Sequence, residues 1–351
     1  MKLSIVLNNI AGIGGVERVV TNFCNQLYEK YKCEIHIISL FSNNDSEIFY
    51  DLKREIKVIH LGNKNLKNIK VIRQFFKFKK ENYNFMLCCS VSISLLALIT
   101  KVLGNNSTKI IAWEHSQYDN TSPLTKRLRK ISYPFLDHII TLSKHDRDIF
   151  KNYLGQVSVI PNFKSFKSKQ VSNYTNHKII SVGRLGYEKG FDMLIEAINL
   201  IKDQMGDWIL EIYGEGKEYD VLSHKISQYN LENKVFIRPF TPNIKEKYLD
   251  ASIFICSSRS ESFSMVIIEA MECGLPCISF NCKIGPQEII TEGVDGFLVG
   301  TFNIEELSNK IKILIQDSNL RVEMGANAKK KSSKYDVDMI MDDWEHMLSL
   351  R

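Results

Sequence analysis

Short apolar runs rich in Ile, Val, Leu and Phe alternate with longer amphipathic stretches along the first half of the chain. The runs predict strands at Leu3–Leu7, Glu34–Leu40, Val58–Leu61, Phe85–Cys88, Lys109–Trp113, His138–Leu142 and Val157–Ile160. Between several of them the apolar spacing becomes helical, as at Val16–Tyr28, Asn68–Lys80 and Ile93–Leu103. Such alternation is typical of βαβ units built around a parallel sheet.

The same pattern restarts after residue 177. Strands are expected at Lys178–Val182, Ile209–Tyr213, Val235–Arg238, Ile253–Cys256 and Pro276–Phe280. A helix is expected at Phe191–Ile201, where apolar residues recur with a period near 3.6. The chain therefore predicts an α/β protein with two Rossmann-like, doubly wound parallel-sheet domains facing across a cleft. Ligands of such sheets bind beyond the carboxyl ends of the strands.

Domain boundaries follow from the polar, aperiodic stretch after Pro161. We expect a first domain at 1–162, a linker at 163–177 and a second domain at 178–334. Residues 335–351 predict an amphipathic helix, with Met339, Ile340, Trp344 and Met347 available to pack. This helix either closes the second domain or crosses back onto the first.

Composition narrows the function classes only slightly. The net charge is +6, which suits nucleic acid, an anionic membrane surface or a phosphorylated substrate, and equally suits a protein with no such partner. The eight cysteines form no C-x-x-C pair, and Cys273, Cys277 and Cys282 have no clustered histidines, so we expect no metal site. Many unpaired cysteines indicate a reducing, cytoplasmic location.

Targeting and membrane-spanning segments are not predicted. The first apolar run is short and is interpreted as a strand rather than a signal peptide. The longest apolar tract, Phe85–Leu103, contains several serines and Lys101 and is interpreted as a strand followed by a helix. A spanning helix needs roughly 20 predominantly apolar residues.

Two glutamates flank the start of a predicted helix in the second domain. Glu261 lies in the turn after the strand Ile253–Cys256, and Glu269 lies inside the helix, which runs to about Cys273. Backbone N–H groups at such a helix start attract anions. The alternative is that Ser258 and Glu261 form a capping box and Glu269 is a solvated helix residue.

The loop Gly183–Gly190 carries two cations at a second helix start. Arg184 and Lys189 flank this glycine-containing loop, which follows the strand Lys178–Val182. Two cations combined with amide donors and a helix dipole hold a diphosphate efficiently. The alternative is an ordinary exposed basic loop.

Two features of the first domain are weaker evidence for a ligand site when each is taken alone. Gly12, Gly14 and Gly15 follow the first strand, but a dinucleotide fingerprint requires glycine where this chain has Glu17. This argues against a hydride-transferring enzyme, and a plain tight turn is the alternative. His115 follows the strand Lys109–Trp113 and either contacts a substrate or is a structural hydrogen-bonding residue.

Taken together, these motifs resemble the retaining family 4 glycosyltransferases, which have the two-domain GT-B fold. Glu261 and Glu269 match that family's E-x7-E signature, and GRLGYEKG at 183–190 resembles its G-R-L…E-K-G loop. GGVER at 14–18, Pro161-Asn162 and the segment 281–299 are similar to further family motifs. The resemblance runs in order over nearly the whole chain.

The resemblance implies a role for each matched residue. The catalytic residues would be Arg184, Lys189, Glu261 and His115. The donor-binding residues would be Gly14, Gly15, Arg184, Lys189, Pro239, Glu261, Phe263, Ser264, Met265, Val266 and Glu269. Arg184 and Lys189 would hold the diphosphate, Glu269 the ribose, Glu261 and His115 the sugar, and the backbone near Pro239 the base. The family needs no metal or other cofactor, and a hexose or N-acetylhexosamine linked to UDP is the expected donor.

One departure concerns the donor sugar. The family usually has glycine where this chain has Ser264, and a side chain there either narrows the sugar pocket or donates a hydrogen bond. The donor sugar is therefore not assigned from the resemblance.

The expected acceptor is a saccharide carried on a polyprenyl diphosphate at an anionic membrane surface. Basic and aromatic residues of the first domain favour such a surface: Lys64, Lys67, Lys70, Arg73, Lys77, Lys79, Lys80, Lys126, Arg127, Arg129 and Lys130, with Phe75, Phe76 and Phe78. The alternative is that these are solvated helix faces with phenylalanines in the core.

Three other functions share some of these sequence features. A sugar-nucleotide epimerase has a similar two-domain fold but acts on the donor without an acceptor. A basic nucleic-acid-binding module fits the net charge, but no recognised nucleic-acid-binding motif stands out in the sequence. A catalytically silent partner subunit is disfavoured because the motif set is intact.

Overall fold

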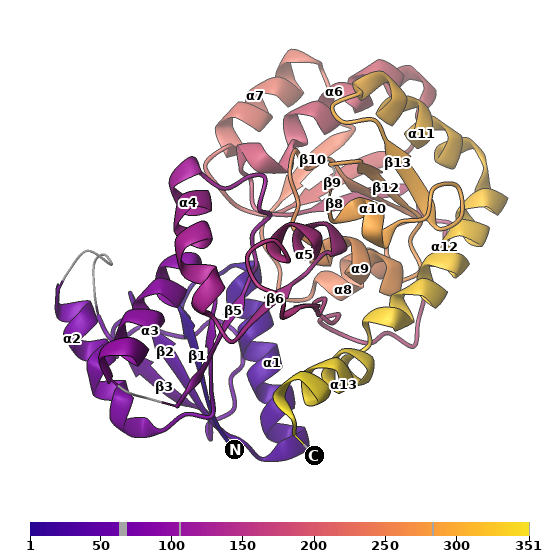
Figure 1. The fold of residues 1–351 in the computed structure, drawn as a ribbon. Coiled ribbons are helices and arrows are strands. Elements are labelled where there is room, and N and C mark those ends of the chain that lie inside the picture. The colour runs from indigo at the N-terminus through magenta and orange to yellow at the C-terminus, as the bar shows by residue number, and fades with distance from the viewer. Residues whose placement is uncertain (63–68, 105–106, 283, 351) are drawn as a thin grey trace. The chain divides into compact units, whose positions relative to one another are not determined.

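Two compact units make up the chain in a computed structural model that describes residues 1–62, 69–104, 107–282 and 284–350. The first unit comprises Met1–Asn162 together with Val337–Arg351, and the second comprises Phe163–Asp336 (Figure 1). Each unit contains one parallel sheet with helices on both of its faces, as βαβ connections require.

The sheet of the first unit has seven parallel strands in the order β3-β2-β1-β4-β5-β6-β7. The strands are β1 (Lys2–Leu7), β2 (Glu34–Ser39), β3 (Lys57–His60), β4 (Phe85–Cys88), β5 (Lys109–Trp113), β6 (His138–Thr141) and β7 (Val157–Val159). The helices are α1 (Gly15–Tyr31), α2 (Ile69–Lys77), η1 (Phe78–Glu81), α3 (Val91–Gly104), α4 (Pro123–Ser132), η2 (Tyr133–Phe135), α5 (Lys144–Phe150) and, from the chain's end, α13 (Val337–Leu348).

The two faces of this sheet have separate cores. Helices α2, α3 and α5 with η2 cover one face, where Phe75, Leu96 and Phe150 pack on Met86 and Ile139 from the strands. Side chains alternate along a strand, so Trp113 of β5 points to the opposite face. There the Trp113 ring lies 5.1 Å from Phe23 of α1 and 4.9 Å from Trp344 of α13.

The terminal helix α13 belongs to the first unit. The Phe23 and Trp344 rings are 4.4 Å apart, Lys30 pairs with Asp342 at 2.9 Å, and the Tyr31 hydroxyl donates to Glu345 at 2.6 Å. Of the two alternatives for this terminal segment, the structure therefore shows the one in which the helix crosses back and packs on the first unit.

The sheet of the second unit has six parallel strands in the order β10-β9-β8-β11-β12-β13. The strands are β8 (Lys178–Val182), β9 (Ile209–Tyr213), β10 (Val235–Arg238), β11 (Ile253–Cys256), β12 (Cys277–Phe280) and β13 (Gly296–Val299). The helices are η3 (Tyr187–Lys189), α6 (Phe191–Ile201), η4 (Lys202–Gln204), α7 (Tyr219–Gln228), α8 (Ile244–Leu249), α9 (Met265–Glu272), α10 (Pro286–Ile289), α11 (Ile304–Gln316), α12 (Ser318–Ser332) and η5 (Ser333–Tyr335).

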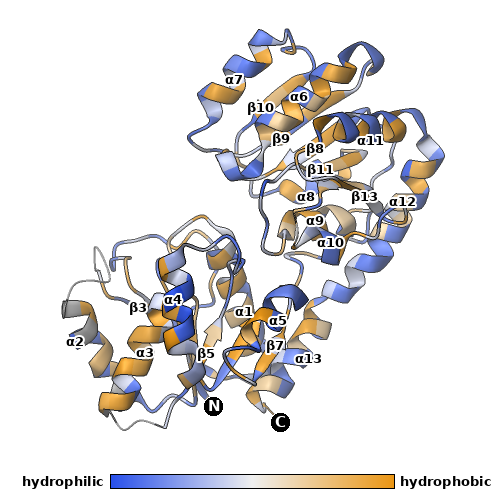
Figure 2. Ribbon diagram, turned by 45° about the horizontal axis from the view of Figure 1, so that its top comes forward, coloured by the Kyte–Doolittle hydropathy of each residue, from blue (hydrophilic) through white to orange (hydrophobic). Residues whose placement is uncertain are grey.

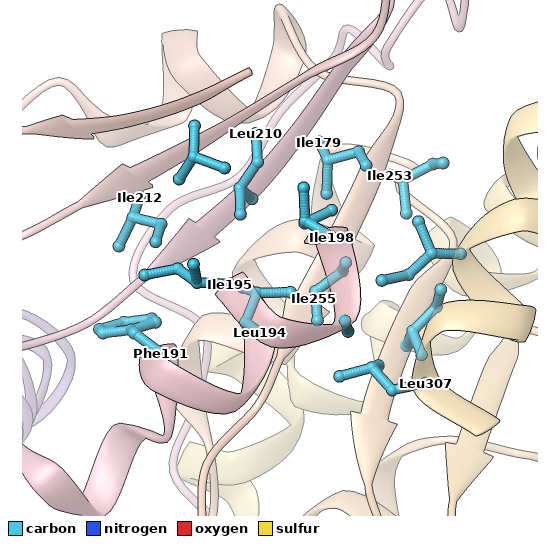
Figure 3. Close-up of a cluster of buried hydrophobic side chains, with 14 of the residues drawn as sticks. Ile179, Phe191, Leu194, Ile195, Ile198, Leu210, Ile212, Ile253, Ile255 and Leu307 are labelled. Carbon is cyan, nitrogen blue, oxygen red and sulfur yellow. The ribbon is translucent and has the colours of Figure 1, made fainter. Parts of the chain in front are cut away.

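The central strands of the second unit are apolar on both faces, since each face is covered by helices (Figure 2). Figure 3 shows one of these cores, in which Leu194 and Ile198 of α6 lie among Ile179, Leu210 and Ile253 of the strands. Leu307 of α11 packs in the same cluster. This core fixes the strand ends from which the candidate site is built.

Three sequence-based expectations need correction or addition. Strand β13 was not predicted, and it begins with Gly296, where a Cβ would lie 2.1 Å from the Cys277 carbonyl oxygen of β12. Residues 163–177, expected as a linker, lie in the second unit, and there Ser172 N donates to the Cys273 carbonyl at 2.8 Å. Arg129, expected on a basic surface, is buried against Glu114.

The structure describes only some of the residues that were expected at a membrane surface. Lys64 and Lys67 lie outside the described residues, as do the side chains of Lys70, Lys79 and Lys80. In the part of the chain that is described, every helix is too short or too polar to pass through a lipid bilayer.

Candidate functional site

Strands β8 and β11 meet at the point where the strand order of the second sheet reverses. The chain leaves β8 toward β9 and β10 on one side, and it leaves β11 toward β12 and β13 on the other. The loops after two such strands diverge and leave a crevice at their carboxyl ends, where ligands of open α/β sheets bind. The two loops are residues 183–190 and 257–264, the segments in which the sequence places its charged motifs.

Backbone contacts join these two loops. Ser257 Oγ donates to the Lys189 carbonyl at 3.0 Å, and Arg259 N donates to the Glu188 carbonyl at 2.8 Å. Gly190 has a φ of 63°, and a Cβ on it would lie 2.1 Å from the Ser257 carbonyl oxygen. Only glycine permits this left-handed conformation together with so close an approach, so the loops are held in a fixed relation.

The side chain of Arg259 adds a second connection between the loops. Its guanidinium donates to both carboxylate oxygens of Asp192 at 2.7 Å and to the Tyr187 carbonyl at 2.7 Å. It also lies 3.9 Å from the centroid of the Tyr187 ring. The hydrogen bond to Asp192 raises the pKa of Arg259, so this bidentate pair stays charged. Arg259 was not among the residues predicted from the sequence, although it lies two positions before Glu261.

Lys189 and Glu261 form an ion pair within the crevice. Lys189 Nζ lies 2.6 Å from Glu261 Oε1, and the Ser258 hydroxyl donates to the same oxygen at 2.7 Å. The two side chains are only 23% and 10% exposed. Burial disfavours the charged form of Lys189, but the Glu261 carboxylate outweighs it and holds the Lys189 pKa above its ordinary value. The lysine is therefore a cation at neutral pH, close to the strand ends.

Arg184 lies at the other end of the same loop in a different environment. It donates to Glu188 at 2.7 Å and is 75% exposed. Partial burial opposes the Glu188 charge, but the Arg184 hydrogen bond lowers the Glu188 pKa. The two predicted cations thus differ: Lys189 is paired with Glu261 inside the loops, and Arg184 is paired with Glu188 at the surface.

Glu269 is buried rather than solvated, which contradicts the alternative interpretation of this residue. Ser165 Oγ donates to its Oε1 at 2.6 Å, and the Tyr248 hydroxyl donates to its Oε2 at 3.5 Å. The capping-box alternative is also wrong, because α9 begins at Met265 and its N-cap is Ser264 rather than Ser258.

The backbone at the start of α9 shows why the family usually has glycine at the position of Ser264. This serine has φ and ψ of 43° and 71°, a left-handed conformation that glycine adopts at no steric cost. Its side chain does not cap the helix and instead lies 3.6 Å from Cys256 Sγ. Phe263 is buried with its ring 5.7 Å from Tyr335, and Met265 and Val266 form the first turn of α9.

A pocket of about 410 Å³ opens at the ends of the neighbouring strands β9 and β10. It is lined by Gly214, Glu215, Gly216, Tyr219, Ile237, Arg238 and Pro239. Pro239 was expected to line the base site, whereas the Gly214–Gly216 segment and Tyr219 were missed. The signal for them is the GEG sequence directly after the strand Ile209–Tyr213. A Cβ on Gly214 would lie 1.8 Å from the Gly183 carbonyl, so this pocket adjoins the Lys189 loop.

The glycine loop of the first unit follows β1, which is central in its sheet beside β4. The Glu17 carboxylate bends back over the loop, so that a Cβ on Gly14 would lie 2.4 Å from Glu17 Oε2. A Cβ on Gly15 would meet nothing within 4 Å. The loop backbone is therefore open at Gly15 and covered at Gly14.

His115 lies just beyond β5 in the first unit, with its ring 4.6 Å from that of Trp113. Burial lowers the pKa of His115 to about 3, so its imidazole is neutral at physiological pH. Within the described residues, its buried Nε2 atom has no hydrogen-bond partner. This disfavours the alternative of a structural hydrogen bond through Nε2, because buried polar atoms are normally paired.

Among the side chains of the described residues, no group of three or more His, Cys, Asp or Glu is arranged to hold a metal ion.

Comparison with known proteins identifies the family. The model of glycosyl transferases group 1 matches residues 162–331, and the model of glycosyltransferase family 4 matches residues 13–163. The two matches adjoin and together span residues 13–331, which includes most of both units. The chain belongs to glycosyltransferase family 4.

Relatives of this family 4 glycosyltransferase align with it from end to end. An uncharacterized glycosyltransferase of Haemophilus influenzae is 28% identical, with 99% of each chain covered. The amylovoran biosynthesis glycosyltransferase AmsD of Erwinia amylovora is 26% identical, also with 99% of each chain covered. A Campylobacter jejuni enzyme, named as an α-1,4-N-acetyl-D-galactosaminyltransferase acting on a diphospho-undecaprenol-linked saccharide, is 26% identical over 99% of this chain and 98% of that protein.

The fold of the family 4 glycosyltransferase also matches solved structures. Anabaena HepE in complex with UDP-glucose superimposes with a TM-score of 0.83 at 21% identity, with 99% of each chain covered. This likeness confirms the GT-B class of two parallel α/β domains that was expected from the sequence.

Proposed function

We propose that this family 4 glycosyltransferase transfers a hexose or N-acetylhexosamine from a UDP-sugar to a saccharide acceptor, with retention of anomeric configuration and without a metal ion. The acceptor is a polyprenyl-diphosphate-linked saccharide used in cell-surface polysaccharide or glycolipid synthesis. The observation that carries the proposal is the Lys189–Glu261 pair at the reversal of strand order, beside the pocket lined by Pro239.

The two cations of the loop 183–190 act on the diphosphate leaving group. As the glycosidic bond breaks, negative charge accumulates on the diphosphate, and cations fixed in place stabilise that charge more strongly in the transition state than in the ground state. Lys189 suits this role because it is protonated and held by the loop contacts. Arg184 supplies the second cation from a surface position.

The remaining groups orient the donor. Glu261 contacts the transferred sugar, and Glu269 binds the ribose in place of its hydrogen bond from Ser165. The pocket with Pro239 holds the base. His115 is neutral, so it contacts the sugar as a hydrogen-bonding group and not as a cation. We propose further that the open backbone at Gly15, with Gly14 beside it, approaches the donor phosphates.

The proposed donor and acceptor are also supported by relatives and structural neighbours. The Campylobacter jejuni relative is named for a lipid-linked saccharide acceptor, and the Erwinia amylovora relative for amylovoran biosynthesis. The structural neighbour HepE was solved with UDP-glucose. A lipid-linked acceptor implies work at a membrane surface, and the charge of the first unit suits an anionic one.

A nucleotide-sugar panel tests the proposal. The protein is incubated with UDP-, GDP- and ADP-linked hexoses and N-acetylhexosamines, with and without polyprenyl-diphosphate-linked saccharide, and the products are separated. We expect acceptor-dependent consumption of one UDP-sugar, and an α-anomeric product from an α-linked donor by NMR. Consumption of the donor without any glycosylated acceptor would instead support the epimerase, and an inverted product would contradict retention.

A further inference from the structure

A buried guanidinium in the first unit holds three positions of the loop between β5 and α4. Arg129 of α4 is only 1% exposed, and its Nε and Nη2 atoms donate to the two carboxylate oxygens of Glu114, with 3.3 Å between Nε and Oε1. Its Nη2 also donates to Ser116 Oγ at 3.1 Å, and its Nη1 donates to Thr121 Oγ1 at 2.8 Å. The loop is therefore held at its beginning and at its end by one side chain.

His115 lies between two of these partners of Arg129. Glu114 and Ser116 come directly before and after it, and both side chains reach the guanidinium. The His115 ring instead lies 4.6 Å from the ring of Trp113, whose side chain points to the opposite face of the sheet. Alternate side chains of an extended segment point in opposite directions. Arg129 thus holds the chain from the side opposite to the imidazole.

The middle of the same loop is anchored to α5 and again to Arg129. Tyr118 N donates to Asp146 Oδ1 at 3.1 Å, and the Tyr118 hydroxyl lies 2.6 Å from the Tyr153 hydroxyl. The Arg129 guanidinium lies 5.6 Å from the centroid of the Tyr118 ring. The loop is therefore fixed in its middle as well as at both ends, and Arg129 contacts it at each of these places.

Stability alone does not require an ion pair at this position. A buried pair of charges loses its hydration, and apolar residues of similar volume are often equally stabilising. The guanidinium supplies geometry instead, because its donors form a rigid planar fork, whereas the donors of a lysine lie on a single nitrogen. Tyr133, one helical turn after Arg129, also donates to Glu114, so the orientation of the carboxylate is set from two sides.

We propose that Arg129 is a positioning residue for sugar transfer, which fixes the loop 114–121 so that His115 meets the donor sugar. The inference rests on the proposed function, in which His115 contacts that sugar. The Nε2 atom of His115 has no hydrogen-bond partner among the described residues, so the chain on either side contributes most to where the ring lies. Groups that contact a reacting substrate must be held within about 0.5 Å of the productive geometry.

A double-mutant cycle tests whether Arg129 acts through His115. Turnover at saturating donor and acceptor is measured for the unmodified protein, Arg129→Lys, His115→Ala and the double variant. Arg129→Lys keeps the charge but loses the fork, so we expect kcat to fall about tenfold. In a protein that already carries His115→Ala, the same change should lower kcat by less than about twofold. An equal fall in both backgrounds would overturn the proposal.

Ser116→Ala is a milder variant that remains informative if Arg129→Lys does not fold. It removes one hydrogen bond to the loop and leaves the pair of Arg129 with Glu114 in place. We expect a melting temperature close to that of the unmodified protein and a kcat about threefold lower, with no further loss in the His115→Ala background. Equal losses with and without the imidazole would again contradict positioning through His115.

Arg321→Lys is the matched control, because Arg321 is a buried arginine of the second unit. Its Nη1 donates to the carbonyls of Leu314 and Ile315 at 2.6 and 3.0 Å. This variant should lower the melting temperature and leave kcat and UDP affinity unchanged. A fall in kcat as large as that of Arg129→Lys would mean that lost stability, rather than the position of His115, explains both variants.

Nuclear magnetic resonance of isotope-labelled histidine gives a second measurement that does not depend on transfer. The ring signals of His115 are assigned by their absence from His115→Ala. We expect these signals to shift or broaden in Arg129→Lys, while those of the other histidines and the affinity for UDP stay the same. Unchanged His115 signals would overturn the positioning role. Changed signals in a protein that transfers no sugar would overturn only the proposed function.

Discussion

The two sheets have the same strand order near their centres, yet they carry different chemistry at the point where that order reverses. In the second unit, the loops after β8 and β11 are joined by several hydrogen bonds and present the Lys189–Glu261 ion pair. In the first unit, the loop after β1 is glycine-rich, and His115, which follows β5, is half-buried and neutral, with no hydrogen-bond partner for its Nε2 atom among the described residues.

Under the proposed function, the topology fixes where the donor binds, and the side chains of the loops decide which part of the donor each loop binds. A fixed cation suits a diphosphate, whose charge grows during the reaction. A neutral side chain suits a sugar hydroxyl, and an open stretch of backbone allows the donor to approach closely. The two units are therefore expected to respond differently to substitution, with the largest effects in the second.

Lys189→Ala should have the largest effect on turnover. Removing a fixed cation beside the leaving group costs on the order of 2–4 kcal/mol in the barrier, or roughly 30- to 900-fold in kcat. The variant also leaves Glu261 without its cation, so some stability is lost as well. Initial rates of transfer and the melting temperature are measured together.

Lys225→Ala is the matched control for Lys189→Ala. Lys225 of α7 forms an ion pair with Glu196 of α6, and its side chain is about as exposed as that of Lys189. This variant should lose stability but keep its turnover. A similar loss of turnover in both variants would mean that Lys189 acts through stability alone.

Arg184→Ala should have a smaller effect on turnover than Lys189→Ala, and almost none on stability. Arg184 is largely exposed and pairs with Glu188 at the surface, where such pairs contribute about 0–1 kcal/mol. We expect kcat to fall at least tenfold, because the second cation on the diphosphate is lost, while the melting temperature is unchanged. Unchanged turnover would remove Arg184 from the donor site.

Much of this contrast follows from local sequence. Strands β4, β5, β8, β9, β10 and β11 have the bounds that their apolar runs predict, and the charged loops follow the expected strands. Pairings between distant segments are not visible in this way. The partner of Arg129 is Glu114 at the end of β5, and the partner of Glu269 is Ser165, more than a hundred residues away. Strand β13 is short and begins with glycine, which weakens its strand signal.

Glycine substitutions test the loops of the two units separately. Gly15→Ala should fold normally because the added Cβ meets nothing within 4 Å, and activity should fall roughly tenfold if the backbone there approaches the donor. Gly190→Ala should instead lower the melting temperature, since its Cβ would collide with the Ser257 carbonyl at a positive φ. Full activity in a well-folded Gly15→Ala protein would exclude that close approach.

The last effect concerns the pH dependence of stability in the first unit. The pKa of His115 is about 3 in the folded protein, against an ordinary value of 6.5. As the pH falls, the unfolded protein therefore binds a proton at this residue before the folded protein does. Folding is therefore disfavoured progressively as the pH falls below about 6.5, by up to about 1.4 kcal/mol per pH unit. Thermal melts of the unmodified protein should decline more steeply with acid than those of His115→Asn. Parallel curves would show that His115 is protonated in the folded state.

The most direct test of the central claim is calorimetric binding of UDP, with uridine for comparison, to the unmodified protein, Lys189→Ala and Lys225→Ala. The diphosphate pairs with Lys189 in this account, so UDP should bind the unmodified protein and Lys225→Ala alike, and Lys189→Ala at least tenfold more weakly. Equal affinity of UDP for all three proteins would contradict it.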